Sequence, residues 1–81
     1  MGIEYRDGRF VIWANKNSRP GTYTAMIHDL GRRASKTERD YITPSEEEVI
    51  RVLDLIAGMS LEDRQAYLTA YMAMSLSLGD E

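Results

Sequence analysis

The dipeptide Asp7-Gly8 constrains the fold of this chain most strongly, because it separates two short runs of residues that favour β-strands. An Asp-Gly pair tolerates the positive φ angles that a two-residue type I′ hairpin turn requires. With that turn, Arg6 is expected to lie opposite Arg9, and Tyr5 opposite Phe10. The sequence therefore predicts a β-hairpin at the N-terminus.

The alternation of side chains divides this hairpin into two unlike faces. The apolar side chains share one face, which is predicted to be the core side: Ile3, Tyr5, Phe10, Ile12 and Ala14. The other face is expected to be at least partly wet and carries Glu4, Arg6, Arg9, Val11 and Trp13.

A third extended run, at residues 22–28, follows a polar and turn-rich segment at residues 15–21. Its alternation places Tyr23, Ala25 and Ile27 on one side, which matches a sheet with one apolar and one mixed face. We expect a three-stranded antiparallel β-meander over residues 1–30. Such a sheet needs a helix to cover its apolar face.

A helix start is predicted after residues 31–43, a charged segment without an apolar period that is expected to form a loop. In Thr43-Pro44-Ser45-Glu46, Thr43 is expected to be the N-cap, with Pro44 at the first helical position and Glu46 closing a capping box. The glutamates that follow suit the positive end of the helix dipole.

This first helix is predicted to span residues 44–57, with Gly58 ending it in a left-handed conformation. Ser60 is expected to cap a second helix over residues 61–78. The predicted fold class is α+β: a three-stranded antiparallel β-meander followed by an α-helical hairpin packed on one sheet face, in a single domain over residues 1–81. The buried stripe of the first helix is expected to be Val49, Val52, Leu53 and Ile56.

The second helix is apolar on almost every side between Ala66 and Leu78. One row is predicted to pack on the first helix and the sheet: Leu61, Leu68, Met72 and Ser75. The opposite row is predicted to form a homodimer interface, with a groove for a foreign partner as the alternative: Tyr67, Tyr71, Met74 and Leu78. Self-association would support the thin core of an 81-residue chain that has no disulfide.

Charge is distributed unevenly, since the net charge of -3 combines a basic N-terminal half with an acidic C-terminal half. A basic half raises the chance of an anionic partner, although the overall balance is not that of most nucleic-acid binders. Trp13 has two readings: an interface anchor on the exposed sheet face, or a side chain buried against the loop at residues 31–41. The predicted partner-binding residues are Arg6, Arg9, Trp13, Lys16, Arg19, Arg32 and Arg33.

The residue types argue against catalysis. There is no cysteine and only one histidine, so His28-Asp29 is the only adjacent pair suited to acid–base chemistry, and no nucleophile motif accompanies it. Scattered carboxylates with one histidine do not have the spacing of a zinc or calcium site. We therefore expect a protein that is not an enzyme and has no metal or cofactor. With neither a signal-peptide pattern nor a long apolar run, it is expected to be cytoplasmic.

These exclusions leave binding as the predicted function. We expect a small non-catalytic protein-binding module, such as an inhibitor or regulator of a host protein complex encoded by a phage or mobile element, for example an anti-defence protein, that acts by occluding a surface. The alternative is a small dimeric DNA-binding transcriptional regulator that uses its basic β-ribbon.

Overall fold

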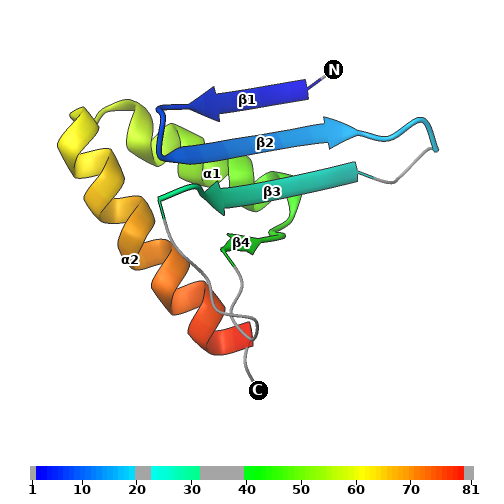
Figure 1. The fold of residues 1–81 in the computed structure, drawn as a ribbon. Helices are drawn as coiled ribbons and strands as arrows, with labels where there is room; N and C mark the ends of the chain where they lie inside the picture. The colour runs from blue at the N-terminus through cyan, green and yellow to red at the C-terminus, as the bar shows by residue number, and fades with distance from the viewer. Residues whose placement is uncertain (1, 20–22, 32–39, 80–81) are drawn as a thin grey trace.

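Four strands and two helices follow one another in the computed structural model, which describes residues 2–19, 23–31 and 40–79 (Figure 1). For Lys16, Tyr23, Ser77 and Leu78 only the backbone is described. The strands form one antiparallel sheet in the order β1-β2-β3-β4, so the predicted α+β class with its meander and helical pair is confirmed. The elements are β1 (Gly2–Arg6), β2 (Phe10–Lys16), β3 (Tyr23–Asp29), β4 (Tyr41–Ile42), α1 (Glu46–Ala57) and α2 (Leu61–Gly79).

The hairpin turn lies one residue later than predicted. Tyr5 pairs with Ile12 rather than Phe10, and the Asp7 backbone N–H donates to the Phe10 carbonyl at 3.3 Å, which leaves Gly8 and Arg9 between them. Gly8 has a φ of 96°, and no other described residue has a positive φ, whereas a type I′ turn needs two. The Asp7 carboxylate stabilises the turn, because it accepts hydrogen bonds from the Arg9 and Phe10 backbone N–H groups at 2.9 and 2.8 Å.

This change of register alters the partners but not the faces. Moving the turn by one residue shifts each cross-strand partner by two residues, and side chains alternate with a period of two. Phe10, Ile12 and Ala14 therefore still point into the core, where Ile12 pairs with Ile27 and Ala14 with Ala25 across β3. The core joins this face to both helices through Phe10, Ile12, Ala14, Ala25, Ile27, Val49, Val52, Ile56, Leu68 and Met72.

A short fourth strand lies inside the segment that was predicted to be a loop throughout. Ile42 pairs with Ile27, and Tyr41 pairs with His28. The Asp29 backbone N–H also donates to the Asp40 carbonyl at 2.9 Å. Tyr41 and Ile42 are too short a run to show the alternation of a strand in the sequence. They form a strand because the outer edge of β3 offers unpaired backbone groups.

The first helix begins at Glu46, two residues later than predicted, with Ser45 rather than Thr43 as its N-cap. Ser45 has extended backbone angles, and its hydroxyl accepts from the Glu48 backbone N–H at 3.1 Å. The sequence contains two overlapping capping patterns, Thr43 to Glu46 and Ser45 to Glu48, which local chemistry does not distinguish. The chain leaves β4 still extended, and the later of the two patterns is used.

Replacing Ser45 with alanine is therefore expected to lower the free energy of unfolding by about 1 kcal/mol, the usual cost of losing an N-cap hydroxyl. Thr43→Ala is the matched control and is expected to change it by less than about 0.5 kcal/mol. Urea denaturation followed by circular dichroism measures both values. A larger loss for Thr43→Ala than for Ser45→Ala would contradict the cap seen in the structure.

The end of α1 also differs from the prediction. Gly58 has a φ of -90° and is not left-handed. The side chain of Arg64, from the first turn of α2, donates instead to the backbone carbonyls of Ile56 and Ala57 at 2.8 and 3.3 Å. The last carbonyls of a helix have no partner within it. The Ile56 carbonyl also accepts from the backbone N–H groups of Gly58 and Met59, and Arg64 of the next helix adds its side-chain hydrogen bonds to this end of α1.

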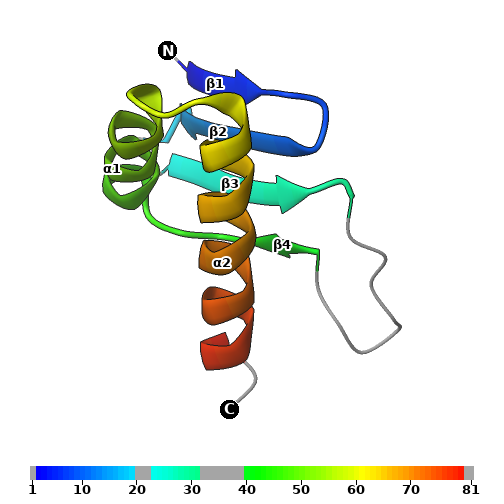
Figure 2. The same ribbon diagram turned by 90° about the vertical axis from the view of Figure 1, so that its left-hand side faces the viewer.

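The second helix runs across the strands (Figure 2). Ser60 caps it as predicted, accepting from the Asp63 backbone N–H at 3.2 Å. Of the row predicted to be buried, Leu68 and Met72 lie in the core, whereas Leu61 is 54% exposed. The prediction for Leu61 was wrong because the α2 residues that pack in or against the core cluster begin only at Tyr67, beyond the first turn.

Candidate functional site

Both helices cover the same face of the sheet, and α1 lies behind β2 and β3 in Figure 1. No described element covers the opposite face. We call this opposite face the open face, and define it by the side chains that alternate away from the core: Glu4, Arg6, Val11, Trp13, Asn15, Thr24, Met26, His28 and Tyr41.

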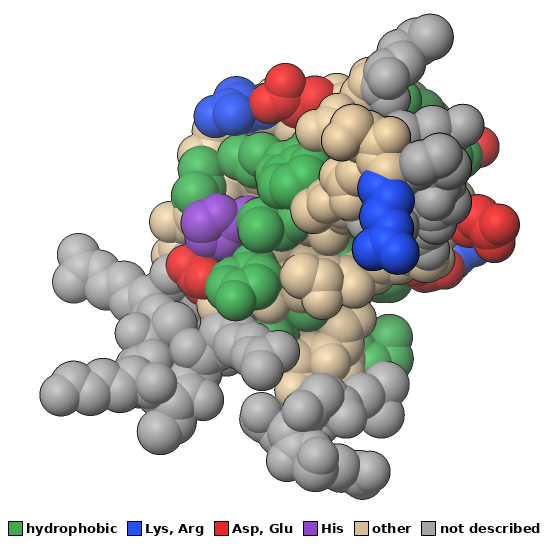
Figure 3. Space-filling view, turned by 90° about the vertical axis from the view of Figure 1, so that its right-hand side faces the viewer, with side chains coloured by type: hydrophobic (Ala, Val, Ile, Leu, Met, Phe, Trp, Pro, Cys, Tyr) green, Lys and Arg blue, Asp and Glu red, His purple; other side chains and the backbone are tan. Residues whose placement is uncertain are grey.

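The strand register arranges the open face in two main rows. Trp13 lies between Glu4 of β1 and Met26 of β3. In the next row, Arg6, Val11, His28 and Tyr41 follow one another from β1 to β4. The middle of both rows is mostly apolar, whereas the solvent face of an antiparallel sheet is usually polar. Figure 3 shows hydrophobic side chains gathered beside the purple histidine on this side of the molecule.

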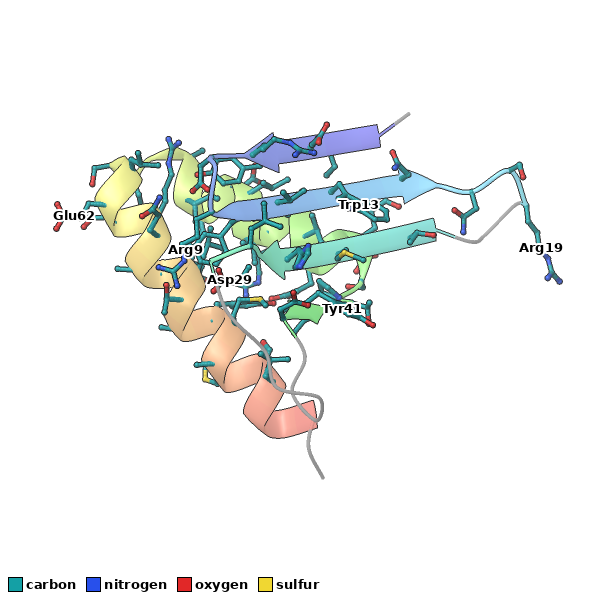
Figure 4. All side chains as sticks on the ribbon, in the orientation of Figure 1. Arg9, Trp13, Arg19, Asp29, Tyr41 and Glu62 are labelled. Carbon is teal, nitrogen blue, oxygen red and sulfur yellow. The ribbon has the colours of Figure 1, made fainter. Side chains whose placement is uncertain are left out.

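Trp13 is half-buried in the middle of the sheet (Figure 4). Most of the segment against which it was predicted to pack, residues 32–39, lies outside the described residues. The placement of Trp13 on the open face agrees with the hairpin alternation. Val11 is buried on the same face but is not part of the core cluster. The two side chains thus form the apolar centre of the open face.

His28 and Asp29, adjacent in sequence, point to opposite faces of β3. His28 donates from Nε2 to the Asp40 carboxylate at 2.8 Å, and its ring meets the Tyr41 ring edge to face with centroids 6.3 Å apart. These contacts attach the start of β4 to the open face. The adjacent pair considered for acid–base chemistry therefore does not act as one unit.

Asp29 is buried and is bound by Arg9 instead. Arg9 donates from Nε and Nη2 to the two carboxylate oxygens at 3.1 and 3.2 Å, and the Gly31 backbone N–H adds a third bond at 3.0 Å. The carboxylate of Asp29 raises the pKa of Arg9. The guanidinium also lies 4.9 Å from the centre of the Phe10 ring. Arg9 was predicted to contact a partner, and its charge is already neutralised within the fold.

Those of the other predicted partner-binding residues that the structure describes do not gather in one patch. Arg6 lies on the open face and pairs with Glu4 at 3.0 Å. Arg19 lies at the far end of the connection between β2 and β3 (Figure 4). Arg32 and Arg33, and the side chain of Lys16, fall outside the described part of the chain. The described residues therefore do not form a continuous basic ribbon of the kind that the DNA-binding alternative needs.

The row predicted to form a dimer interface on α2 contacts α1 in part. The rings of Tyr67 and Tyr71 stack with centroids 6.0 Å apart and pack against the core cluster. The Tyr71 hydroxyl donates to Glu48 at 2.8 Å, and Arg51 also binds Glu48. Met74 is exposed, and the side chain of Leu78 is not described. A dimer through this row stays a prediction, with less free apolar surface than the sequence indicated.

The contacts of Glu48 perturb two groups at this helix pair. Arg51, and then the Tyr71 hydroxyl, lower the pKa of Glu48 to about 2. Burial, and then the hydrogen bond to Glu48, raise the pKa of Tyr71 to about 12. The carboxylate therefore stays ionised and the phenol neutral at ordinary pH. The hydrogen bond from Tyr71 to Glu48 thus joins α2 to α1.

Of the open-face residues, the sequence prediction of partner-binding residues named only Arg6 and Trp13. Met26 could have been found, because the alternation of β3 places it on the mixed face of the sheet, which also holds Trp13. Tyr41 could not, because β4 has no signal of its own.

The described residues provide neither a metal-binding cluster nor a membrane-spanning helix. Among the described residues, no group of three or more His, Cys, Asp or Glu could hold a metal ion. No helix in the described ranges is long and apolar enough to span a membrane. No family model, curated protein or solved structure matches the chain.

Proposed function

We propose that the protein is a non-catalytic protein-binding module that docks a partner protein on its open face and blocks that partner's functional surface. The observation that carries the proposal is the apolar centre of a sheet face that no described helix covers. Val11, Trp13 and Met26 lie at positions where the solvent-exposed face of an antiparallel sheet usually carries polar side chains. Apolar patches with a polar rim are typical of protein interaction sites.

The composition of the open face resembles that of an interface. Its centre holds Trp13, a residue type that often contributes most to binding energy, next to Met26. Charged side chains lie at its two sides: Glu4 and Arg6 pair with each other on β1, and the Asp40 carboxylate binds His28 next to β4. Tyr41 at the other side is exposed and combines an apolar ring with a hydroxyl group. An apolar centre with a polar rim fits another protein better than a phosphate backbone.

The test compares capture of partner proteins by the wild type and three variants. Trp13→Ala and Tyr41→Asp alter the open face, and Leu61→Asp places a charge on the helix side as the matched control. The protein retained by wild type and Leu61→Asp is expected to be lost with both open-face variants, with affinity falling by roughly thirtyfold or more for loss of a tryptophan anchor. Circular dichroism checks that each variant is folded.

Trp13 also provides a direct readout, because it is the only tryptophan. Its emission is expected to shift to shorter wavelength when the captured protein is titrated into the wild type, since docking would remove water from the ring. Equal capture by all variants, or loss only with Leu61→Asp, would contradict the proposal.

A further inference from the structure

Strand β1 forms one outer edge of the sheet, and no described element lies beyond it (Figures 1 and 2). Because the Asp7 backbone N–H points at β2, the alternation of antiparallel pairs directs the backbone groups of Tyr5 and Ile3 the same way. Those of Gly2, Glu4 and Arg6 therefore point outward. Such a row of backbone donors and acceptors is a template for another strand.

The helices leave this edge partly uncovered. Packing of α1 centres on β2 and β3, and α2 approaches β1 at its first turn, where the Arg64 guanidinium lies 5.9 Å from the centre of the Tyr5 ring. Ile3 points to the core side but remains 38% exposed. An apolar side chain thus lies beside the row of outward backbone groups.

The charged side chains of β1 indicate which strand could pair with its outer edge. Glu4 and Arg6 share the open face, lie two residues apart, and have side chains that are 58% and 63% exposed. A second copy of β1, antiparallel and related by a twofold axis at Tyr5, would place its Arg6 opposite Glu4 and its Glu4 opposite Arg6. Both residues present outward backbone groups, so this register would form two pairs of backbone hydrogen bonds.

Other registers are less favourable. An axis at Glu4 would place two glutamates opposite each other, and an axis at Arg6 would place two arginines opposite each other. An axis between two residues would set outward backbone groups against groups that already point at β2. With the axis at Tyr5, the two Tyr5 side chains are direct neighbours, and Ile3 lies diagonal to Tyr5 of the second copy, within reach of its ring.

We propose that the protein forms a twofold homodimer through β1, with Glu4 opposite Arg6 of the second copy. Residues directly opposite in an antiparallel pair point to the same face, so the two sheets join into one and both open faces lie on the same side. This interface uses neither the α2 row nor the centre of the open face, and it does not depend on the proposed function.

The test is a charge exchange followed by sedimentation velocity. Glu4→Arg makes both facing positions positive, and Arg6→Glu makes both negative, so each variant is expected to raise the dimer dissociation constant by roughly tenfold or more. The double variant Glu4→Arg/Arg6→Glu restores opposite charges and is expected to dimerise like the wild type. Mixing the two single variants is expected to give a heterodimer.

Both positions are exposed, so the single variants are expected to stay folded, as circular dichroism would show. Glu4→Pro gives an independent check, because it removes an outward N–H without breaking a bond to β2. Charged side chains on an edge strand can also prevent pairing. A wild type that is monomeric at its highest soluble concentration would overturn the proposal. So would a dimer that persists in both single variants, or one that only Met74→Glu dissociates.

Discussion

Leu68→Ala is expected to lower the free energy of unfolding by about 2 to 5 kcal/mol, the usual cost of truncating a fully buried leucine. Leu68 is 0% exposed and lies where α2 meets the sheet. A loss of this size is a large fraction of the stability of a small domain. Thermal and urea denaturation followed by circular dichroism measure it.

Leu61→Ala provides the matched control, because the same side-chain truncation is made in the same helix at a position that is 54% exposed. Its expected cost is less than about 0.5 kcal/mol. The periodicity of α2 places both leucines in one buried row and would predict similar losses of stability for the two variants. The packing in the structure predicts a large loss only for Leu68→Ala. Equal losses for the two variants would contradict the position of α2 on the sheet.

Asp29→Ala is expected to lower the free energy of unfolding by about 2 to 3 kcal/mol. The change removes a buried carboxylate that holds Arg9 with two hydrogen bonds and the Gly31 backbone with a third. Breaking a fully buried ion pair costs about 3 to 5 kcal/mol, and we expect less here because the Arg9 side chain is partly exposed to water. Urea denaturation compares it with Asp54→Ala, an exposed carboxylate on α1.

A double-mutant cycle with Arg9→Met would isolate the interaction between the two side chains. We expect the losses of the single variants to be far from additive, because either change alone breaks the same pair. An Asp29→Ala variant as stable as Asp54→Ala would show that the pair does not hold the end of the hairpin, and Arg9 would return to the set of candidate partner-binding residues.

The faces of the sheet were predictable from sequence because they depend only on alternation. Ile12 and Trp13 are neighbours on β2, so they must point to opposite sides whatever the exact pairing. This is why the error in register did not move any paired strand residue to the wrong face. Arg9 is the exception, because it lies in the turn and binds Asp29 instead of joining the open face. The same argument places Met26 on the same face as Trp13, but only the register in the structure makes the two side chains neighbours.

The positions of helix ends and turns were less predictable, because several local patterns compete. Thr43 and Ser45 both start a capping box, and Asp7-Gly8 and Gly8-Arg9 can both be the centre of a turn. The choice depends on where the flanking strands and helices pack. Local chemistry offers the alternatives within one or two residues of each other, and the packing selects among them.

By itself, the sequence determined the α+β class, the order of the main elements, the apolar face of the sheet and the capping of α2 by Ser60. Each of these follows from periodicity or from chemistry within a few residues. Only the tertiary structure decided that β4 pairs with β3, that Arg64 caps α1, that Asp29 neutralises Arg9, and that Leu61 stays exposed. These contacts join residues from different elements, and their energies depend on distances between elements that no local pattern encodes.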